Sequence, residues 1–402
     1  MTNDQGSGYG RNAVVPAEDT TLTHVAFGTP MGELMRRYWQ PICLSAELAD
    51  LPKFLRILGE ELVAYRDKSG RVGVLGAHCC HRGTSLEYGR IEENGLRCCY
   101  HGWYFNEEGK CLDQPGEPED SPYKDEVRQP WYPAEEYKGL VFAYMGPLDK
   151  KPLLPRYDIL ERDDVEFLAY RNYSRGEVAA CNWLQLVAAC NWLQLQENAA
   201  DPVHTNILHG WNPGLFEFSE VMAVKPDYDY VHSPRHVSYV RTTNLDNGNR
   251  LTRTSTIFVP TARSVPPTEV TGTDPDRETE RARMVGWWVP VDNENTVGFH
   301  VEIIDPTKKI FQPPHAPVLR SYEETQRAPD DWEAQTSQRP IARHALEHLA
   351  TSDRGVVLFR RHLREAIETM ERGKDPPFVT RDPADQVIVI PSGNEVVGAA
   401  ET

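Results

Sequence analysis

Two short segments of this 402-residue chain each combine a cysteine with a histidine. The first contains Cys79-x-His81, and the second, which begins sixteen residues later, contains Cys98-x-x-His101. Two thiolates and two imidazoles from two loops can hold either a tetrahedral zinc ion or a two-iron, two-sulfur cluster. The Cys-x-His spacing fits zinc less well, because zinc ligands within one loop are usually separated by two to four residues. These residue types indicate a metal centre of one of these two kinds.

A further segment, downstream of the two Cys-His loops, combines a carboxylate with two histidines. Its pattern is Asp201-x-x-His204-x-x-x-x-His209. Two neutral imidazoles and one carboxylate hold ferrous iron in many proteins and leave positions open for dioxygen. Glu197, Asp201 and His204 share one face of a helix, but His209 is rotated from His204 by about 140°. We therefore expect the helix to bend or end, and Pro202 offers a break. The alternative is that Asp201 only caps a helix that begins at Pro202, and that the histidines are structural.

The surroundings of the first pair of loops carry a resemblance to a known family. An Arg-Gly follows His81, and Tyr-His-Gly-Trp surrounds His101, as in the Rieske iron–sulfur domain. The resemblance implies that Cys79 and Cys98 bind one iron of a [2Fe-2S] cluster and that the two histidines bind the other. Together with the second motif, residues 36–375 resemble the oxygenase α subunit of Rieske non-haem iron aromatic-ring-hydroxylating oxygenases.

The same resemblance implies roles for the second segment. His204 and His209 are expected to bind a mononuclear Fe(II), and Asp201 is expected to bridge this iron site to the Rieske cluster of a neighbouring subunit. Glu197 and Asn198 match the same motif but receive no definite role.

The third iron ligand is expected far downstream. Residues 330–355 resemble the phthalate dioxygenase-like branch of the family, in which the ligand precedes a Pro-Ile step by nine residues, and this position is Asp331. Asp330 is the main competitor and Asp353 a weaker one. The alternative is that Asp330 or Asp331 merely caps a helix that begins near Trp332.

Composition and charge limit the possible partners. The chain has 43 Lys and Arg against 60 Asp and Glu, a net charge of −17, which argues against nucleic-acid and anionic-membrane partners. The longest apolar runs, such as residues 140–145, are too short to span a bilayer, and the polar N-terminus lacks the features of a signal peptide. We expect a cytoplasmic protein.

The eight cysteines are too few and too clustered for a disulfide scaffold. Cys80 and Cys99 directly follow the two candidate cysteine ligands. Alternation along the chain predicts that they turn away from the cluster, and we expect them to be packing residues.

The spacing of turn signals and apolar residues predicts an α+β chain with two domains. Short β-like runs, 56–62, 72–76, 96–100 and 140–144, indicate an N-terminal all-β Rieske domain over 36–150. Alternation between residues 231 and 304, followed by helical spacing over 356–370, indicates an α+β catalytic domain over 151–375, with helices on an antiparallel sheet. Ser352 is the expected N-cap of the last helix, and Gly373 its stop. Residues 1–35 are expected to be a tail and lead-in, and 376–402 a C-terminal tail.

One segment is duplicated in tandem. Residues 178–186 and 187–195 have the same sequence, VAACNWLQL. Nine residues advance a helix by about 900°, or two and a half turns, so the two copies would face opposite sides of a helix. A given structural position can therefore hold only one copy. The second copy runs directly into the iron motif, so we expect the first to be the insertion.

The resemblance implies the oxygenase component of a multicomponent enzyme that activates dioxygen at the mononuclear iron. The expected substrate is an aromatic compound that is dihydroxylated, monohydroxylated or O-dealkylated, and the phthalate dioxygenase-like branch suggests a carboxylated ring. No dinucleotide-binding Gly motif is present, so we expect a separate NAD(P)H-dependent reductase of the flavin or ferredoxin type. Related proteins form homotrimers. A Rieske electron-transfer protein with an inactive second domain is the alternative, and a zinc protein a third interpretation.

Overall fold

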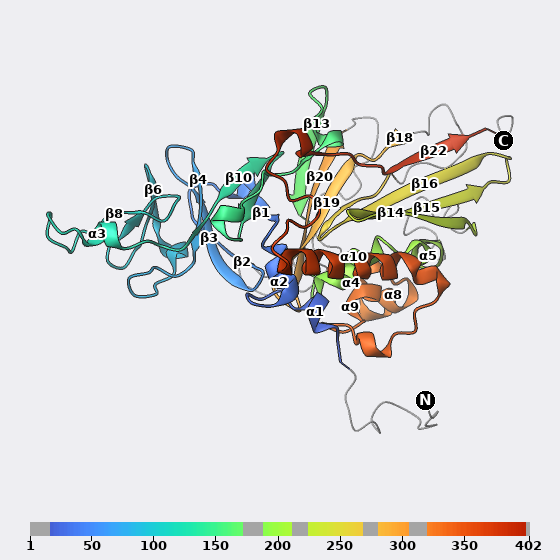
Figure 1. Cartoon of the computed structure of the whole chain (residues 1–402), viewed down its shortest axis with the longest axis horizontal. Helices are drawn as coiled ribbons and strands as arrows, with labels where there is room; N and C mark the ends of the chain where they lie inside the picture. The colour runs from blue at the N-terminus through green and yellow to red at the C-terminus, as the bar shows by residue number, and fades with distance from the viewer. Residues whose placement is uncertain (1–16, 172–187, 211–223, 268–279, 305–319, 399–402) are drawn as a thin grey trace, which may run out of the picture.

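The computed structural model describes residues 17–171, 188–210, 224–267, 280–304 and 320–398. Figure 1 shows a β-rich N-terminal lobe on one side and, on the other, a large sheet with helices beneath it. Within these ranges, no helix is long and apolar enough to cross a membrane.

The N-terminal lobe is built almost entirely of short antiparallel strands, as the sequence predicts. Its one α-helix within the described residues is the single turn α3 (Tyr123–Glu126). The strands form three sheets: β1 (Trp39–Leu44), β11 (Leu140–Tyr144) and β10 (Ala134–Tyr137); β2 (Lys53–Ile57), β3 (Glu60–Arg66), β4 (Val72–Gly76) and β9 (Trp131–Tyr132); and β5 (Arg90–Glu92), β6 (Gly95–Arg97), β7 (Tyr104–Phe105) and β8 (Cys111–Asp113).

Two of the predicted runs differ from the structure. The run 56–62 is not one strand, because Leu58 and Gly59 both have positive φ, 52° and 79°, and form the hairpin turn between β2 and β3. The run 96–100 ends as a strand at Arg97, since the chain leaves the sheet there to form the second Cys-His loop.

The second half is an α+β domain around a nine-stranded antiparallel sheet. Figure 1 shows α10 running beneath the strands, and α10 contacts β14 and β15. The sheet order is β13 (Glu166–Arg171), β20 (Thr296–Ile304), β19 (Met284–Pro290), β17 (Ala262–Ser264), β16 (Arg250–Phe258), β15 (His236–Asn244) and β14 (Asp227–Ser233). In addition, β22 (Gly393–Val397) pairs with β16, and β18 (Glu280–Arg281) pairs with β22.

Several helices accompany this sheet. The α-helices are α4 (Trp192–Asn198), α5 (Pro202–His204), α8 (Tyr322–Arg327), α9 (Asp331–Thr336) and α10 (Arg354–Glu371). A π-helix, η6, covers Thr205–His209. The 3₁₀ turns are η2 (Ser45–Glu47), η3 (Leu86–Tyr88), η4 (Leu148–Lys150), η5 (Asp158–Leu160), η7 (His344–Leu346), η8 (Thr351–Asp353) and η9 (Pro383–Asp385).

The long helix α10 buries the apolar face that its spacing predicts, and it ends two residues before Gly373, which has a φ of 75°. The predicted N-cap, Ser352, is wrong. Ser352 lies inside the 3₁₀ turn η8, where the Asp353 carboxylate accepts a hydrogen bond from the Ala350 amide, and α10 starts only at Arg354.

Residues near both ends of the described part of the chain contribute to the folded body. The short helices α1 (Thr20–Thr23) and α2 (Pro30–Met35) contact α10, and their buried residues join the main core. At the other end, β21 (Val387–Ile388) pairs with β12 (Arg156–Tyr157), and β22 pairs with β16. The expectation of a C-terminal tail over 376–402 is therefore wrong as far as residue 398, because these strands are built into the second domain. The domain boundaries themselves stay a prediction.

The second copy of the duplicated nonapeptide supplies the start of α4. Asn191 caps this helix by accepting a hydrogen bond from the Leu193 amide at 3.1 Å, and Trp192 and Leu195 are buried in the core. The helix then runs on to Asn198, just ahead of the candidate iron ligands. The first copy, 178–186, lies outside the described residues.

The two lobes share one hydrophobic core. Phe142 of β11 packs edge-on against Trp287 of β19, with ring centroids 5.6 Å apart, and the Leu58 amide donates to the Pro290 carbonyl at 2.9 Å. A second, smaller core surrounds the two Cys-His loops at the far end of the N-terminal lobe. In one chain these loops and α5 lie at opposite sides of the molecule (Figure 1).

Candidate metal centres

The two Cys-His loops share one backbone pattern. The Cys79 carbonyl accepts a hydrogen bond from the Gly83 amide at 2.8 Å, and the Cys98 carbonyl accepts one from the Gly102 amide at 3.2 Å. Both glycines have positive φ, 76° and 74°, which lets each loop turn back sharply after its histidine.

The four side chains predicted to hold the cluster lie together. Cys79 and Cys98 are 3% and 4% exposed, whereas the rings of His81 and His101 lie nearer the surface with centroids 4.5 Å apart. Trp103 stacks on His81 at 4.4 Å and holds its ring in place. Burial raises the pKa of Cys79 to about 12, so its thiolate needs a bound cation in order to form. This donor set fits a cluster whose thiolate side is buried and whose imidazole side faces outward.

The two neighbouring cysteines do not pack. Cys80 and Cys99 do turn away from the buried cysteines, but both are exposed at the surface. The expectation that they are packing residues is wrong, because the position that follows each buried cysteine is exposed to solvent. The cysteines within the described residues are free, in line with the absence of a disulfide scaffold.

The second candidate centre brings together His204, His209 and Asp331. The Asp331 carboxylate oxygens lie 3.8 Å from His204 Nε2 and 3.5 Å from His209 Nε2, and one ligand atom from each residue lies within 4.8 Å of the others. Ligand atoms about 2.1 Å from a first-row metal ion lie at most about 4.2 Å apart. A small contraction would therefore let all three atoms bind one ion.

A π-helix explains how two histidines five residues apart reach the same ion. In η6 the Gly210 amide donates to the Thr205 carbonyl at 3.2 Å, five residues earlier. In such a turn, residues five apart lie nearly above each other, and π-helical turns are frequent at functional sites. As predicted, the α-helix does end between the two histidines, since α5 stops at His204, but the chain continues as a π-helix and does not bend away. The break at Pro202 precedes both histidines, and a widened helix aligns them.

Asp201 has the capping role considered for it, and its bridging role stays a prediction. Its Oδ1 caps α5 by accepting hydrogen bonds from the amides of Val203 at 2.8 Å and His204 at 3.4 Å. Its backbone carbonyl accepts a hydrogen bond from His204 Nδ1 at 2.5 Å, which leaves Nε2 free to face Asp331. The Asp201 side chain as a whole is 31% exposed.

Asp330 and Asp331 have different environments. Asp330 is the N-cap of α9: its side chain accepts from the Trp332 amide at 2.9 Å and lies 3.5 Å from Arg320. Asp331, one residue later, points at the histidines and accepts a hydrogen bond from Asn198 Nδ2 at 3.1 Å. The helix cap and the candidate ligand are thus adjacent residues with separate tasks.

Two further acidic residues lie outside the candidate ligand set. Glu197 is buried and forms a two-fold hydrogen-bonded ion pair with Arg360, one contact being 2.8 Å long, and Arg360 also binds Glu347. This network ties α4 to α10. Asp353 accepts from the Ala350 amide at 2.6 Å and closes the turn before α10.

Burial favours the form of His209 that binds metal. It lowers the pKa of His209, and the Asp331 carboxylate only partly opposes this effect. The imidazole is therefore neutral at neutral pH, as a metal ligand must be.

The sequence offered no signal for the apolar wall beside this centre. Trp288 of β19 belongs to a small buried cluster with Leu195 of α4, and Trp332, the residue after Asp331, packs against this cluster. These residues come from three segments that are distant in the sequence, and only the folded sheet brings them together.

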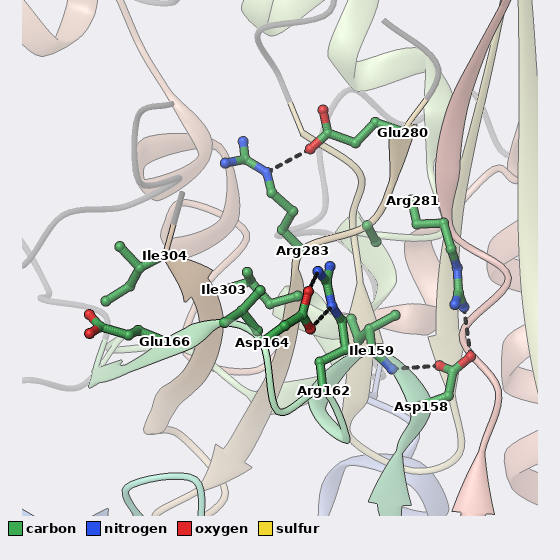
Figure 2. A pocket seen from close by; sticks show the side chains of 12 residues that line it. Asp158, Ile159, Arg162, Asp164, Glu166, Glu280, Arg281, Arg283, Ile303 and Ile304 are labelled. Atoms are coloured by element: carbon green, nitrogen blue, oxygen red, sulfur yellow. Dashed lines mark hydrogen bonds and ion pairs between the residues drawn. The ribbon is translucent and has the colours of Figure 1, made fainter. Parts of the chain in front are cut away.

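A separate cavity of about 710 Å³ opens beside β13, β18 and β20, and none of the candidate metal ligands lines it. Figure 2 shows that its arginines are already neutralised by acids: Arg162 by Asp164, Arg281 by Asp158 and Arg283 by Glu280. Because its arginines are paired, we assign no anionic ligand to this cavity.

Comparisons with known proteins agree with the geometry. Residues 38–133 match the family model of the Rieske [2Fe-2S] domain. The chain is 41% identical to the phenoxybenzoate dioxygenase subunit alpha of Ectopseudomonas oleovorans, over 98% of this chain and 95% of that one. It is 40% identical to the tert-butanol monooxygenase / tert-amyl alcohol desaturase oxygenase subunit of Aquincola tertiaricarbonis, over 88% and 76%. Among solved structures, dicamba monooxygenase shares the fold, with a TM-score of 0.62 and 17% identity over 84% of this chain and 99% of that one.

These matches extend over both domains and favour an oxygenase over a Rieske electron-transfer protein. The expected cofactors, a Rieske [2Fe-2S] cluster and a mononuclear iron, are those of the family, and its members work with a reductase partner, a substrate and O₂. The chain belongs to the Rieske non-haem iron oxygenases, as an oxygenase α subunit.

Proposed function

We propose that this chain oxidises an aromatic compound at an iron held by His204, His209 and Asp331. The observation that carries the proposal is the convergence of two imidazole Nε2 atoms and one carboxylate within 4.8 Å. Iron held by such a triad keeps positions open at which dioxygen is activated.

The protein supplies orientation and a dry site. The backbone carbonyl of Asp201 fixes the ring of His204, and the Asn198 amide fixes the carboxylate of Asp331. Trp288 and Trp332 provide flat apolar surface on which an aromatic ring can pack while water is excluded. This wall favours an aromatic substrate, such as the one in the name of the phenoxybenzoate relative.

For the electron path, we propose that the cluster sits on Cys79, His81, Cys98 and His101 and serves the iron of another subunit. The two centres lie at opposite sides of one chain (Figure 1), which makes transfer within one chain unfavourable. A closed ring of three chains would place each cluster beside the next iron. The partly exposed Asp201 carboxylate is then the group that meets His101 of the next chain.

Two further features of the enzyme remain proposals. The electrons come from an NAD(P)H-dependent reductase of the flavin or ferredoxin type, and the enzyme works in the cytoplasm. The family's need for a reductase partner supports the first of these.

Iron content and oxygen uptake test this function together. The wild type should hold three irons per chain, two in the cluster and one at the triad, and should consume O₂ with an aromatic acid and a compatible reductase. The double variant His204→Ala/His209→Ala should keep two irons and the visible cluster spectrum but lose product formation. The exposed His348→Ala is the matched control and should behave as the wild type. A double variant that keeps three irons and full activity would contradict the assignment.

A further inference from the structure

Four residues form a row across the sheet beside the candidate iron site. Arg263 of β17 pairs with Gly286 of β19, Gly286 pairs with His300 of β20, and His300 pairs with Tyr170 of β13. Directly paired residues point to the same face of a sheet. A Cβ on Gly286 would lie 2.6 Å from the His300 ring, so only glycine leaves room there. In this gap Arg263 Nη2 comes within 3.5 Å of His300 Nε2.

This row is on the face that carries the apolar wall. The Arg263 guanidinium lies over the Trp288 ring, 4.6 Å from its centroid. Trp288 in turn belongs to a buried cluster with Leu195, against which Trp332, the residue after the candidate ligand Asp331, packs. Burial lowers the pKa of Arg263 to about 10, and the Asp331 carboxylate opposes this effect, so the two side chains are close enough to interact electrostatically. Arg263 therefore lies close to the candidate iron site.

Arg263 is a buried cation without a counter-ion. It is 8% exposed, it forms no ion pair with any carboxylate in the described part of the chain, and its Nε has no hydrogen-bond partner there. Another buried arginine, Arg253, is bound by the carbonyls of Pro266 and Pro267 and by Asn394. An isolated buried charge is strongly unfavourable unless a ligand pairs with it.

The neighbours of Arg263 also have unused polar atoms. His300 is fully buried, its Nδ1 has no partner within the described residues, and burial lowers its pKa well below the usual value, so the ring is neutral. If Nε2 accepts from Arg263, Nδ1 carries the proton and can donate it to a ligand. The Trp288 Nε1 is likewise buried without a partner.

We propose that Arg263, supported by His300 and stacked on Trp288, binds the carboxylate of an aromatic acid and so sets both the substrate class and the position of the ring beside the iron. A guanidinium matches a carboxylate through two parallel hydrogen bonds, which fixes orientation as well as charge. The row of Arg263, Gly286 and His300 is thus a specificity site. This inference rests on the proposed oxygenase function and narrows it to aromatic acids.

Binding to the iron-loaded, anaerobic holoenzyme tests the proposal without turnover. Calorimetry measures Kd for phenoxybenzoate and for phenoxybenzamide, which keeps both rings and loses the charge. The wild type should prefer the acid. Arg263→Met should weaken binding of the acid at least about 30-fold and of the amide less than about 3-fold, with Arg263→Lys between the two for the acid. Arg162→Met, in the cavity of Figure 2, is the arginine control and should change neither.

Each other outcome has a definite meaning. An acid affinity that survives Arg263→Met, with iron and cluster contents intact, would overturn the proposal, and so would equal losses for acid and amide. If Arg263→Met does not fold, the affinities of Arg263→Lys and of the wild type for the acid and the amide test the proposal instead. A wild type that binds the amide as tightly as the acid, or binds neither compound, refutes the proposal. Measurements of oxygen uptake distinguish failure of the Arg263 proposal from failure of the proposed function. A wild type that oxidises acid and amide equally is still an oxygenase but contradicts the role of Arg263. A wild type that oxidises no aromatic compound is not the proposed enzyme.

Discussion

Exchanging one carboxylate at a time at the start of α9 separates metal binding from helix capping. Asp331→Asn keeps the shape of the side chain and removes the charge that faces His204 and His209 at 3.8 and 3.5 Å. Asp330→Asn makes the same chemical change one residue earlier, where the carboxylate accepts from the Trp332 amide and faces Arg320. Asparagine still caps helices well, so the fold should survive both changes.

The two substitutions should differ in both kind and size of effect. Loss of a residue that merely supports a metal ligand typically costs 10- to 100-fold in metal affinity, so loss of the ligand itself should exceed about 100-fold, or about 2.8 kcal/mol. Asp330→Asn loses part of the attraction to Arg320 and should cost about 1 kcal/mol or less, a fall in Tm of about 2–4 °C for a domain of this size.

The assay is iron content after dialysis, with the [2Fe-2S] absorption as an internal standard in the same sample. Asp331→Asn should fall to two irons per chain with an unchanged cluster spectrum and lose oxygen uptake. Asp330→Asn should keep three irons and most of its activity. The reverse pattern, with iron lost from Asp330→Asn and retained in Asp331→Asn, would refute the reasoning from the cap geometry.

Three other changes test the rest of the structure. Cys98→Ala should abolish the visible cluster absorption and leave the mononuclear iron in place, because one thiolate cannot hold the cysteine-bound iron; surviving absorption would contradict the ligand assignment. Asp201→Asn should retain both centres, because His204 is held by the Asp201 backbone carbonyl, yet should slow oxidation of the cluster in a single turnover at least about 100-fold, since an amide accepts a hydrogen bond from the imidazole of the neighbouring chain poorly; a wild-type rate would rule out the bridge. Deletion of residues 178–186 should preserve iron content and raise Tm, because the copy at 187–195 supplies α4. A marked loss of iron on deletion would show that both copies are needed.

Local spacing was enough to mark the four Cys-His residues, His204 and His209 as candidate metal ligands, whereas Asp331 came from the family resemblance. Cys98 and His101 lie within four residues of each other, and His204 and His209 within six, so their chemistry is visible without the fold. The helix between the histidines was not predictable from a period of 100° per residue. The wider π-turn comes from hydrogen bonds such as that from Gly210 to Thr205, and the spacing of five was its only trace in the sequence.

The residues around the second centre were beyond sequence reasoning because they depend on strand register. Arg263, Gly286 and His300 are separated by 23 and 14 positions, and only the pairing of β17, β19 and β20 aligns them. The choice between Asp330 and Asp331 likewise needed the direction of each side chain at the start of α9. Resemblance pointed to Asp331, and the geometry gives a physical reason for it.

A single turnover under ¹⁸O₂ tests the central claim most directly. The holoenzyme, with its cluster reduced chemically beforehand and phenoxybenzoate bound, is mixed with ¹⁸O₂, and the product is examined by mass spectrometry. Oxygenation at the His204, His209 and Asp331 centre predicts oxidation of the cluster together with a product that carries ¹⁸O, and neither an aromatic product nor label in Asp331→Asn. Oxidation of the cluster in the wild type without labelled product, or an equal yield of labelled product from Asp331→Asn, would contradict it.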